Sequence, residues 1–211
     1  MIKAVLFDFD GTLVDSLEAV RKFVNDVLGM YGYKAIDLED FEKNYFSIPL
    51  KEIFKKRVPN VTQKELDGML KYSFKGYEKY IKLHDGAIEL LERLSKKYIL
   101  GIVTSRRTFS LELTLDEFKM HKYFKLLMPR ESYENPKPHP ESLLKALDKF
   151  KLKPEEAVYV GDNETDVKFA KAAGTKIIIF SKHKIKEADY NVNSLTKVLD
   201  VISGLDGTKS L

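Results

Sequence analysis

The chain has 211 residues, of which 44% are hydrophobic and 32% are charged, and it carries a net charge of +4. This composition is typical of a globular protein with one domain, or with one domain and a smaller insert, and it excludes a disordered chain. The sequence contains no cysteine, which excludes disulfides, thiolate metal sites and a cysteine nucleophile.

An apolar run at the N-terminus predicts a first strand that ends near Phe9 and is buried on both faces of a parallel sheet. Asp8 and Asp10 lie at its end, where residues two positions apart point to the same side. Two such carboxylates repel each other unless a cation lies between them or one of them is protonated. Gly11 permits a turn that the Thr12 hydroxyl can hold. An ordinary polar turn is the alternative reading, and the rest of the chain must decide between them.

The segment from residue 15 to residue 83 has helical periodicity and no strand pattern. Ser16 is the expected N-cap of its first helix. Thr62 and Glu65 form a capping box that opens a longer helix, which we expect to extend to Ile81. We interpret 15–83 as an all-helical cap domain of about four helices.

Beyond this insert, strand and helix patterns alternate along the chain. The predicted strands cover 98–103, 124–128, 157–160, 175–180 and 190–192, and the predicted helices cover 86–96, 108–119, 140–150, 163–173 and 194–202. Such alternation predicts an α/β fold with a parallel sheet. We therefore expect a Rossmann-like three-layer core formed by residues 1–14 and 84–211.

Polar side chains follow two further strands of this predicted sheet. Thr104 and Ser105 follow the strand at 98–103, and Asp162 follows the strand at 157–160, with Asp166 four residues later. Ligands of such sheets bind beyond the carboxyl ends of the strands. We therefore expect these side chains to gather at the same edge as Asp8 and Asp10.

Lys137 lies between two prolines in a loop that precedes a helix, and these prolines favour a rigid extended backbone. A lone lysine is more often solvated, but this setting favours a place at the same sheet edge. Carboxylates, hydroxyls and an ammonium group together suit phosphoryl transfer. One carboxylate can attack phosphorus, a second can move protons, and Mg²⁺ can neutralise charge on the nucleophile and phosphate.

Four sequence motifs, DFDGT, TS, an isolated lysine before a helix and GDNETD, occur in this order. In them the chain resembles the haloacid dehalogenase-like hydrolase superfamily over nearly its whole length. The resemblance implies that Asp8 is the nucleophile and Asp10 the general acid/base. It also implies that Thr104 and Lys137 bind phosphate, and we expect Ser105 to contact it as well.

The same resemblance implies a magnesium site. Its ligands would be the Asp8 carboxylate, the main-chain carbonyl of Asp10 and the Asp162 carboxylate. Asp166 would lie in the outer shell of the metal or brace Lys137. The segment at 15–83 resembles the small helical cap that closes over the substrate in this family.

Asp10 separates the branches of the family, because the dehalogenases that resemble this chain lack an acid there and need no metal. The chain is most similar to phosphoglycolate phosphatase-like members, so we expect a magnesium-dependent phosphatase that hydrolyses a small phosphate monoester through an aspartyl-phosphate intermediate. A phosphosugar mutase of the beta-phosphoglucomutase type is the alternative. The sugar-phosphate mutases usually carry an arginine in the cap loop. No arginine lies between Arg21 and Arg57 in this chain, which disfavours the mutase alternative. A non-enzymatic receiver-like phospho-acceptor is a further alternative, which the helical insert disfavours.

Arg106 and Arg107 follow the predicted phosphate-binding pair, and we expect both to be exposed unless one meets a substrate carboxylate.

No apolar run is long enough to span a bilayer, and we expect that the N-terminal stretch is not a signal peptide. Basic and acidic residues are mixed rather than gathered in a basic patch. We therefore expect a cytoplasmic monomer or small homo-oligomer whose partner is a small phosphorylated metabolite, with no nucleic acid and no membrane partner.

Overall fold

The computed structural model describes residues 1–46, 48–71 and 74–206. The chain divides into a core unit, Met1–Asp15 with Leu83–Leu211, and a cap unit, Ser16–Lys82. These limits lie one residue from the boundaries expected from the sequence.

The core unit is built on a six-stranded sheet in the order β5-β4-β1-β6-β7-β8, in which all neighbouring strands are parallel. β1 lies in the middle of the sheet, and all four of its residues are buried, as its apolar sequence predicts. The strands are β1 (Ala4–Phe7), β4 (Ile99–Val103), β5 (Leu126–Met128), β6 (Ala157–Gly161), β7 (Lys176–Phe180) and β8 (Tyr190–Val192).

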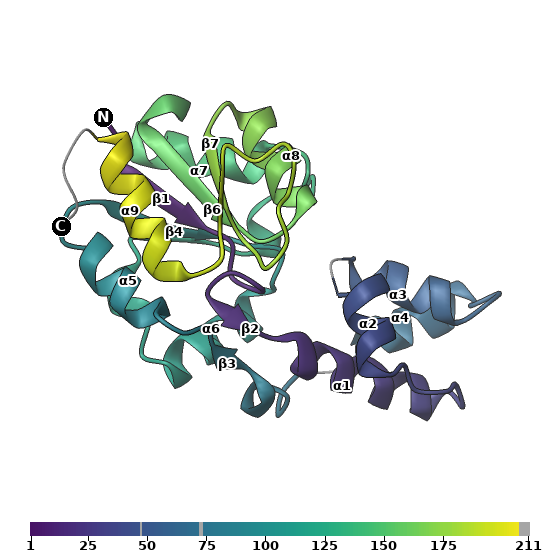
Figure 1. The fold of residues 1–211 in the computed structure, drawn as a ribbon. Helices are drawn as coiled ribbons and strands as arrows, with labels where there is room; N and C mark the ends of the chain where they lie inside the picture. Colours follow the sequence, from purple (N-terminus) through teal and green to yellow (C-terminus); the bar gives the residue numbers. More distant parts are fainter. Residues whose placement is uncertain (47, 72–73, 207–211) are drawn as a thin grey trace. The chain divides into compact units, whose positions relative to one another are not determined.

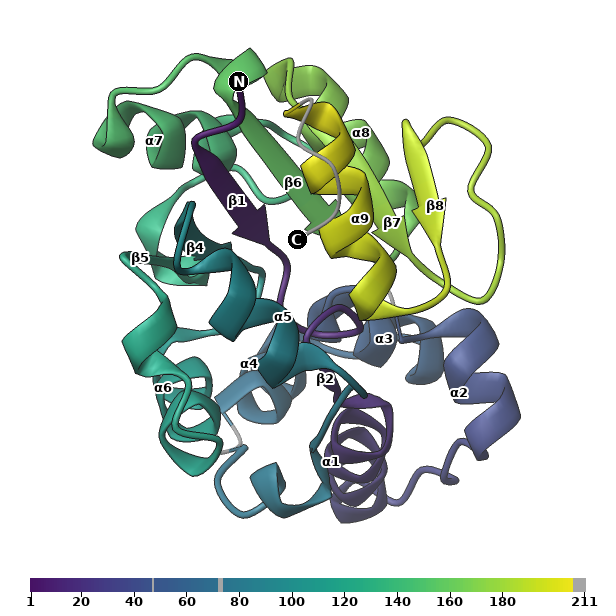
Figure 2. The same cartoon turned by 60° about the vertical axis from the view of Figure 1, so that its left-hand side comes forward.

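Helices cover both faces of this sheet, which gives the expected three layers (Figures 1 and 2). α5 (Ala87–Leu94) and α9 (Leu195–Leu205) lie on one face, and α7 (Glu141–Phe150) and α8 (Glu164–Ala173) lie on the other. α6 (Thr108–Glu117) connects β4 to β5. The structure thus confirms the α/β fold, with a Rossmann-like parallel sheet and an inserted helical segment.

The described residues of the cap unit form four α-helices: α1 (Leu17–Met30), α2 (Leu38–Asn44), α3 (Leu50–Arg57) and α4 (Gln63–Lys71). They enclose a separate apolar cluster whose buried members include Phe23, Phe41 and Phe54. The predicted capping box is present, because the Glu65 N–H donates to Thr62 Oγ1 over 3.3 Å and the Thr62 N–H donates to Glu65 Oε2 over 2.9 Å.

Two details of the expected cap are wrong. The helix expected to reach Ile81 is α4, described as Gln63–Lys71, and residues 74–77 are not helical. Gly76 lies there in the left-handed region at φ +95°, before a short 3₁₀ turn at Glu78–Tyr80. Two strands occur where no strand was expected, since β2 (Val14–Asp15) pairs with β3 (Lys82–Leu83). Ser16 is the N-cap residue of α1, as expected, although its side chain makes no capping hydrogen bond.

No helix in the described part of the chain combines the length and the apolar character needed to cross a bilayer.

Candidate active site

The register of the sheet brings three strand ends to one level. Phe7 of β1 is paired with Ile102 of β4 on one side and with Val160 of β6 on the other. Asp8 follows Phe7 directly, and its N–H donates to the Val160 carbonyl over 2.8 Å. The side chains that follow β1, β4 and β6 therefore lie at one edge of the sheet, where ligands of parallel sheets bind.

The Asp8 carboxylate is fixed at both of its oxygens. The N–H of Phe9 donates to Oδ1 over 2.7 Å, and Lys137 Nζ lies 3.1 Å from Oδ2. Burial raises the pKa of Asp8 to about 7, although the positive charge of Lys137 opposes this rise. A buried carboxylate held in one orientation is suited to attack an electrophile placed beyond the strand end.

The side chain of Lys137 is buried, with 5% of it exposed, and it is held by three oxygen acceptors. Besides Asp8, its ammonium group meets Asp166 Oδ1 at 3.0 Å and donates to the Tyr159 hydroxyl over 2.5 Å. Burial alone would lower the pKa of Lys137, but the carboxylates of Asp166 and Asp8 outweigh it and raise the pKa above its ordinary value. Lys137 therefore carries a positive charge directly beside the Asp8 carboxylate.

Asp8, Asp162 and Asp166 form an acidic cluster in which one oxygen of each lies within 4.8 Å of the others. Burial, together with the negative charges of Asp166 and Asp8, raises the pKa of Asp162 well above its ordinary value. Converging carboxylate oxygens that repel one another fit a hard divalent cation such as Mg²⁺. The side chain of Asp10 is not part of this cluster.

Asp166 is fully buried, and both of its oxygens have protein partners. Oδ1 accepts from Lys137, and Oδ2 accepts from the N–H of Asp162 over 3.1 Å. The side chain of Asn163 caps α8 by accepting from the N–H groups of Thr165 and Asp166. These contacts favour bracing of Lys137 and of the Asp162 loop as the role of Asp166.

Two glycines give these acids room. A Cβ on Gly11 would lie 2.4 Å from Asp162 Oδ2, and Gly11 has φ +79°, which side chains disfavour. A Cβ on Gly161 would lie 2.5 Å from the carboxyl carbon of Asp166. Gly11 of the DFDGT motif and Gly161 of the GDNETD motif therefore allow the backbone to approach the acidic cluster closely.

The Asp10 carboxylate forms a two-pronged ion pair with Arg106. Arg106 Nε donates to Oδ2 over 2.9 Å, and Nη2 donates to Oδ1 over 2.6 Å. The expectation that Arg106 is exposed is wrong, because only 6% of its side chain is exposed, whereas Arg107 is exposed as expected. The pairing of Arg106 with Asp10, across 96 positions of the chain, gave no signal in the sequence.

The two hydroxyl residues after β4 have different surroundings. Thr104 is buried, and its Oγ1 accepts from the N–H of Arg106 over 3.2 Å, which leaves its hydroxyl proton available to a ligand oxygen. Ser105 is exposed. Phosphate binding by either hydroxyl stays a prediction, and the buried position of Thr104 at the strand end supports it more than the exposed position of Ser105.

Tyr159 is a further member of the site that the sequence analysis missed. It lies fully buried in β6, donates its hydroxyl proton to the Val103 carbonyl over 2.9 Å, and accepts from Lys137. Its ring and the ring of Phe169 both lie near the ammonium group, with centroids 5.1 and 5.2 Å from Nζ. A tyrosine within an apolar strand run was the available signal, because a buried hydroxyl needs a partner.

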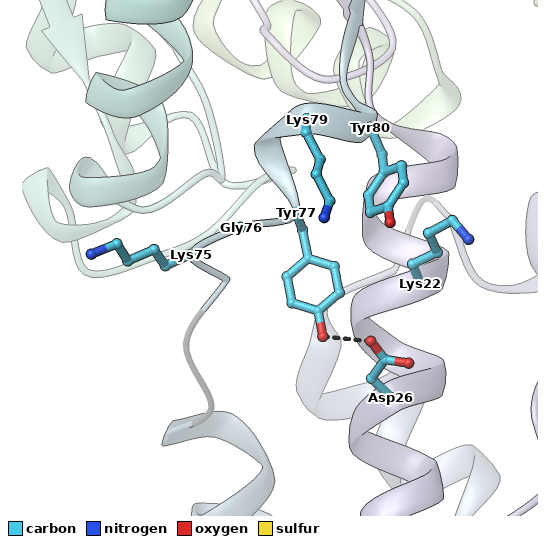
Figure 3. Close-up of a pocket in the computed structure, with 7 residues that line it drawn as sticks. All are labelled: Lys22, Asp26, Lys75, Gly76, Tyr77, Lys79 and Tyr80. Atoms are coloured by element: carbon cyan, nitrogen blue, oxygen red, sulfur yellow. Dashed lines mark hydrogen bonds between the residues drawn. The ribbon is translucent and has the colours of Figure 1, made fainter.

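The cap unit holds a cavity of about 630 Å³ of its own (Figure 3). Its lining contains three lysines and one acid: Lys22, Asp26, Lys75, Gly76, Tyr77, Lys79 and Tyr80. The ammonium groups of Lys22 and Lys79 lie 4.9 and 5.2 Å from the centroid of the Tyr80 ring. The Tyr77 hydroxyl donates to Asp26 over 2.7 Å, and the side chain of Lys75 points away from the others (Figure 3).

Known proteins resemble this chain over nearly its whole length. The model of a family described as haloacid dehalogenase-like hydrolase matches residues 5–180. A relative from Caldanaerobacter subterraneus subsp. tengcongensis, named provisionally as the pyrophosphatase PpaX, is 33% identical over 97% of this chain and 96% of its own. The pyrophosphatase PpaX of Bacillus cereus is 28% identical over 97% of this chain and 98% of its own.

A solved structure supports the same relationship. The crystal structure of a hydrolase of the same superfamily, subfamily IA, variant 1, from Geobacter sulfurreducens has a TM-score of 0.77 and 28% identity. The match covers 95% of this chain and 96% of that protein.

Proposed function

This chain belongs to the haloacid dehalogenase-like hydrolase family and is a phosphatase, and on that premise we propose that it hydrolyses a small phosphate monoester, with magnesium bound, through an aspartyl-phosphate intermediate. One observation carries the proposal: the buried Asp8 carboxylate is held by Phe9 and Lys137 at the carboxyl edge of the sheet, beside Asp162 and Asp166. Such an arrangement suits a carboxylate nucleophile better than a structural turn.

In the first step, an oxygen of Asp8 forms a bond to phosphorus as the bond from phosphorus to the leaving oxygen breaks. Asp10 gives its proton to that oxygen, so the leaving group departs as an alcohol. Lys137 can transfer its hydrogen bond from Asp8 Oδ2 to a phosphoryl oxygen, and the Thr104 hydroxyl can donate to another. The product of this step is a phosphoryl group bonded to Asp8.

In the second step, a water molecule attacks the phosphorus and gives a proton to Asp10. The bond between phosphorus and the Asp8 oxygen breaks, so inorganic phosphate leaves and the Asp8 carboxylate is restored. Asp10 thereby recovers the proton that it gave to the leaving group. Mg²⁺, held by Asp8, Asp162 and the main-chain carbonyl of Asp10, would supply positive charge that offsets the charge on the phosphate.

There are two candidates for the physiological substrate. Phosphoglycolate is the leading candidate from the sequence motifs. A crystal structure described as a predicted phosphoglycolate phosphatase from Haemophilus somnus, at 23% identity and a TM-score of 0.83, shares the fold but is too distant to support an activity. Inorganic pyrophosphate is the second candidate, because the PpaX relatives match 97% of the chain. Pyrophosphate is a phosphoanhydride and not a monoester, so with it the group that leaves in the first step would be phosphate.

A substrate panel tests the proposed function. Phosphoglycolate, pyrophosphate, glucose 1-phosphate and 4-nitrophenyl phosphate are each assayed for phosphate release, with Mg²⁺ and with excess chelator, and ranked by kcat/KM. We expect many turnovers with Mg²⁺ and none with chelator. Conversion of glucose 1-phosphate to an isomer without phosphate release would identify a mutase. Phosphorylation of the protein without turnover would identify a phospho-acceptor.

The substitution Asp8→Asn tests the nucleophile. The variant should stay folded, because the replaced side chain has the same shape and the buried negative charge is lost. Turnover should fall by at least about 10⁴-fold, as expected when a catalytic nucleophile is removed. Asp148→Asn on the exposed side of α7 serves as the matched control and should keep wild-type kcat/KM. Near-normal hydrolysis by Asp8→Asn would disprove the mechanism.

A further inference from the structure

We propose that Arg106 is the positioning residue of Asp10, and that its guanidinium group aims the Asp10 carboxylate at the leaving oxygen and holds it out of the acidic cluster. The inference rests on the proposed function, in which Asp10 moves the protons. In this inference Arg106 acts on the reaction only through Asp10, with which it is paired.

Arg106 and Asp10 form a bidentate pair, in which the guanidinium group and the carboxylate meet in the geometry of a fork. Nε and Nη2 of Arg106 donate to the two different oxygens of Asp10, over 2.9 and 2.6 Å. Two parallel hydrogen bonds fix the plane of a carboxylate, which a single bond or a lysine cannot do. Each carboxylate oxygen keeps a second lone pair, and 30% of the Asp10 side chain is exposed. The carboxylate is therefore oriented without being closed to a substrate.

Arg106 is itself held rigidly from three sides. Its Nη1 donates to Thr114 Oγ1 of α6 over 2.7 Å, and Thr114 donates its own hydroxyl proton to the Ser110 carbonyl over 3.0 Å. The N–H of Arg106 donates to Thr104 Oγ1, and its guanidinium group lies 5.2 Å from the centroid of the Phe9 ring. Thus α6, β4 and the loop after β1 jointly determine where Asp10 points.

The pairing also explains a division among the acids at the sheet edge. The carboxylates of Asp8, Asp162 and Asp166 converge, but that of Asp10 does not, although it lies two residues beyond Asp8. An unpaired Asp10 carboxylate would be attracted to any cation bound by the cluster. Arg106 provides a competing positive charge, and its two hydrogen bonds hold the Asp10 carboxylate outside the cluster.

The leaving group provides the test. Phenyl phosphate needs more proton donation to its leaving oxygen than 4-nitrophenyl phosphate does. The parameter kcat/KM reports only the steps up to formation of the aspartyl phosphate, because hydrolysis of that intermediate comes later. In Arg106→Met, kcat/KM for phenyl phosphate should fall by about 10²-fold, and that for 4-nitrophenyl phosphate by less than about tenfold. Arg106→Lys keeps the charge but not the fork, and should show a smaller change in the same direction.

A double variant separates positioning from a merely structural role. If Arg106 acts through Asp10, then Asp10→Asn with Arg106→Met should be no slower than Asp10→Asn alone. Arg107→Met removes the neighbouring exposed arginine and should leave the ratio of the two substrates unchanged. Thermal unfolding verifies that each variant is folded. If Arg106→Met does not fold, Thr114→Val, which removes the acceptor of Nη1, carries the same comparison.

The outcomes separate this inference from the proposed function. Equal losses with both substrates, or additive losses in the double variant, would show that Arg106 does not act through Asp10. Absence of turnover by the wild-type protein on every phosphate ester would instead contradict the proposed function itself.

Discussion

Gly11 illustrates how a single residue controls the acidic cluster without contributing a functional group. Its backbone adopts φ +79°, and any Cβ there would lie 2.4 Å from the Asp162 carboxylate. A side chain would therefore displace the acid that we propose as a metal ligand. The glycine of the first motif and the aspartate of the last are coupled by contact, although 151 positions separate them in the sequence.

Gly11→Ala should cost both stability and metal affinity. The strained backbone alone should lower the free energy of unfolding by about 1–3 kcal/mol. The contact with Asp162 should in addition weaken Mg²⁺ binding, as measured by isothermal titration calorimetry. Gly32→Ala is the matched control, because Gly32 has φ +78° but a Cβ added there would meet no atom within 4 Å. It should lose similar stability and keep wild-type Mg²⁺ affinity; equal weakening of Mg²⁺ binding in both variants would refute the steric argument.

At the scale of elements, the sequence predicted the strands and helices of the core well, because their patterns are strong and local. The run at 4–7 is wholly apolar and forms β1, and the helix predicted at 140–150 corresponds to α7 at Glu141–Phe150. The cap was predicted less well after Lys71. Apolar residues continue there at helical spacing, and the single signal against a helix was Gly76, whose cost in a helix interior is only about 1 kcal/mol.

The candidate site could be predicted as far as the strand ends. Parallel strands place the residues after β1, β4 and β6 at one edge, so the meeting of Asp8, Asp162 and Asp166 follows from the order of the motifs. The partners of these acids could not be predicted in the same way. The contacts of Arg106 with Asp10, and of Tyr159 with Lys137, depend on how α6 and the loop around Lys137 pack, which no local pattern encodes.

Asp206, which follows α9, ties three parts of the core together. The N–H of Ile2 donates to Oδ1 and the Tyr98 hydroxyl donates to Oδ2, each over 2.7 Å, while Lys97 Nζ lies 3.4 Å from Oδ2. Burial raises the pKa of Asp206, but these hydrogen bonds and the charge of Lys97 outweigh it and hold the pKa below its ordinary value. The charged form of Asp206 therefore stabilises the folded state.

This stabilisation should depend on pH in a defined direction. Because the pKa of Asp206 is lower in the folded state, the contribution is complete above the ordinary aspartate pKa of about 3.9 and is lost as the pH falls through the folded-state value. At pH 7, Asp206→Asn should lower the free energy of unfolding by about 1–3 kcal/mol. Urea unfolding should show this difference shrinking below a pH of about 4. Asp200→Asn, on an exposed position of α9, is the matched control for the substitution of an aspartate by asparagine. A difference that stays constant with pH would contradict the assignment.

At the scale of the whole molecule, each unit has an apolar core of its own. The core unit contains a cluster under α7 and α8 that includes Leu143, Tyr159 and Phe169, and the cap unit contains the cluster around Phe23, Phe41 and Phe54. No member of one cluster belongs to the other among the described residues. Elements that bury separate apolar surfaces can open separately, so the cap can vary without disturbing the acidic cluster.

Phe54→Ala tests this independence. Phe54 is fully buried in the cap cluster, so its truncation should destabilise the cap unit by about 3–5 kcal/mol. Hydrogen exchange should then show lost amide protection in α1 to α4 but unchanged protection in β1 and β6. Because the proposed metal ligands lie in the core unit, Mg²⁺ affinity should stay at the wild-type value. Phe169→Ala is the reciprocal variant: it removes the ring beside Lys137 and Tyr159, and should lower protection in β6 and weaken Mg²⁺ binding. If Phe54→Ala lowers protection in β1 and β6 as much as in α3, the two cores form a single cooperative unit and the independence is refuted.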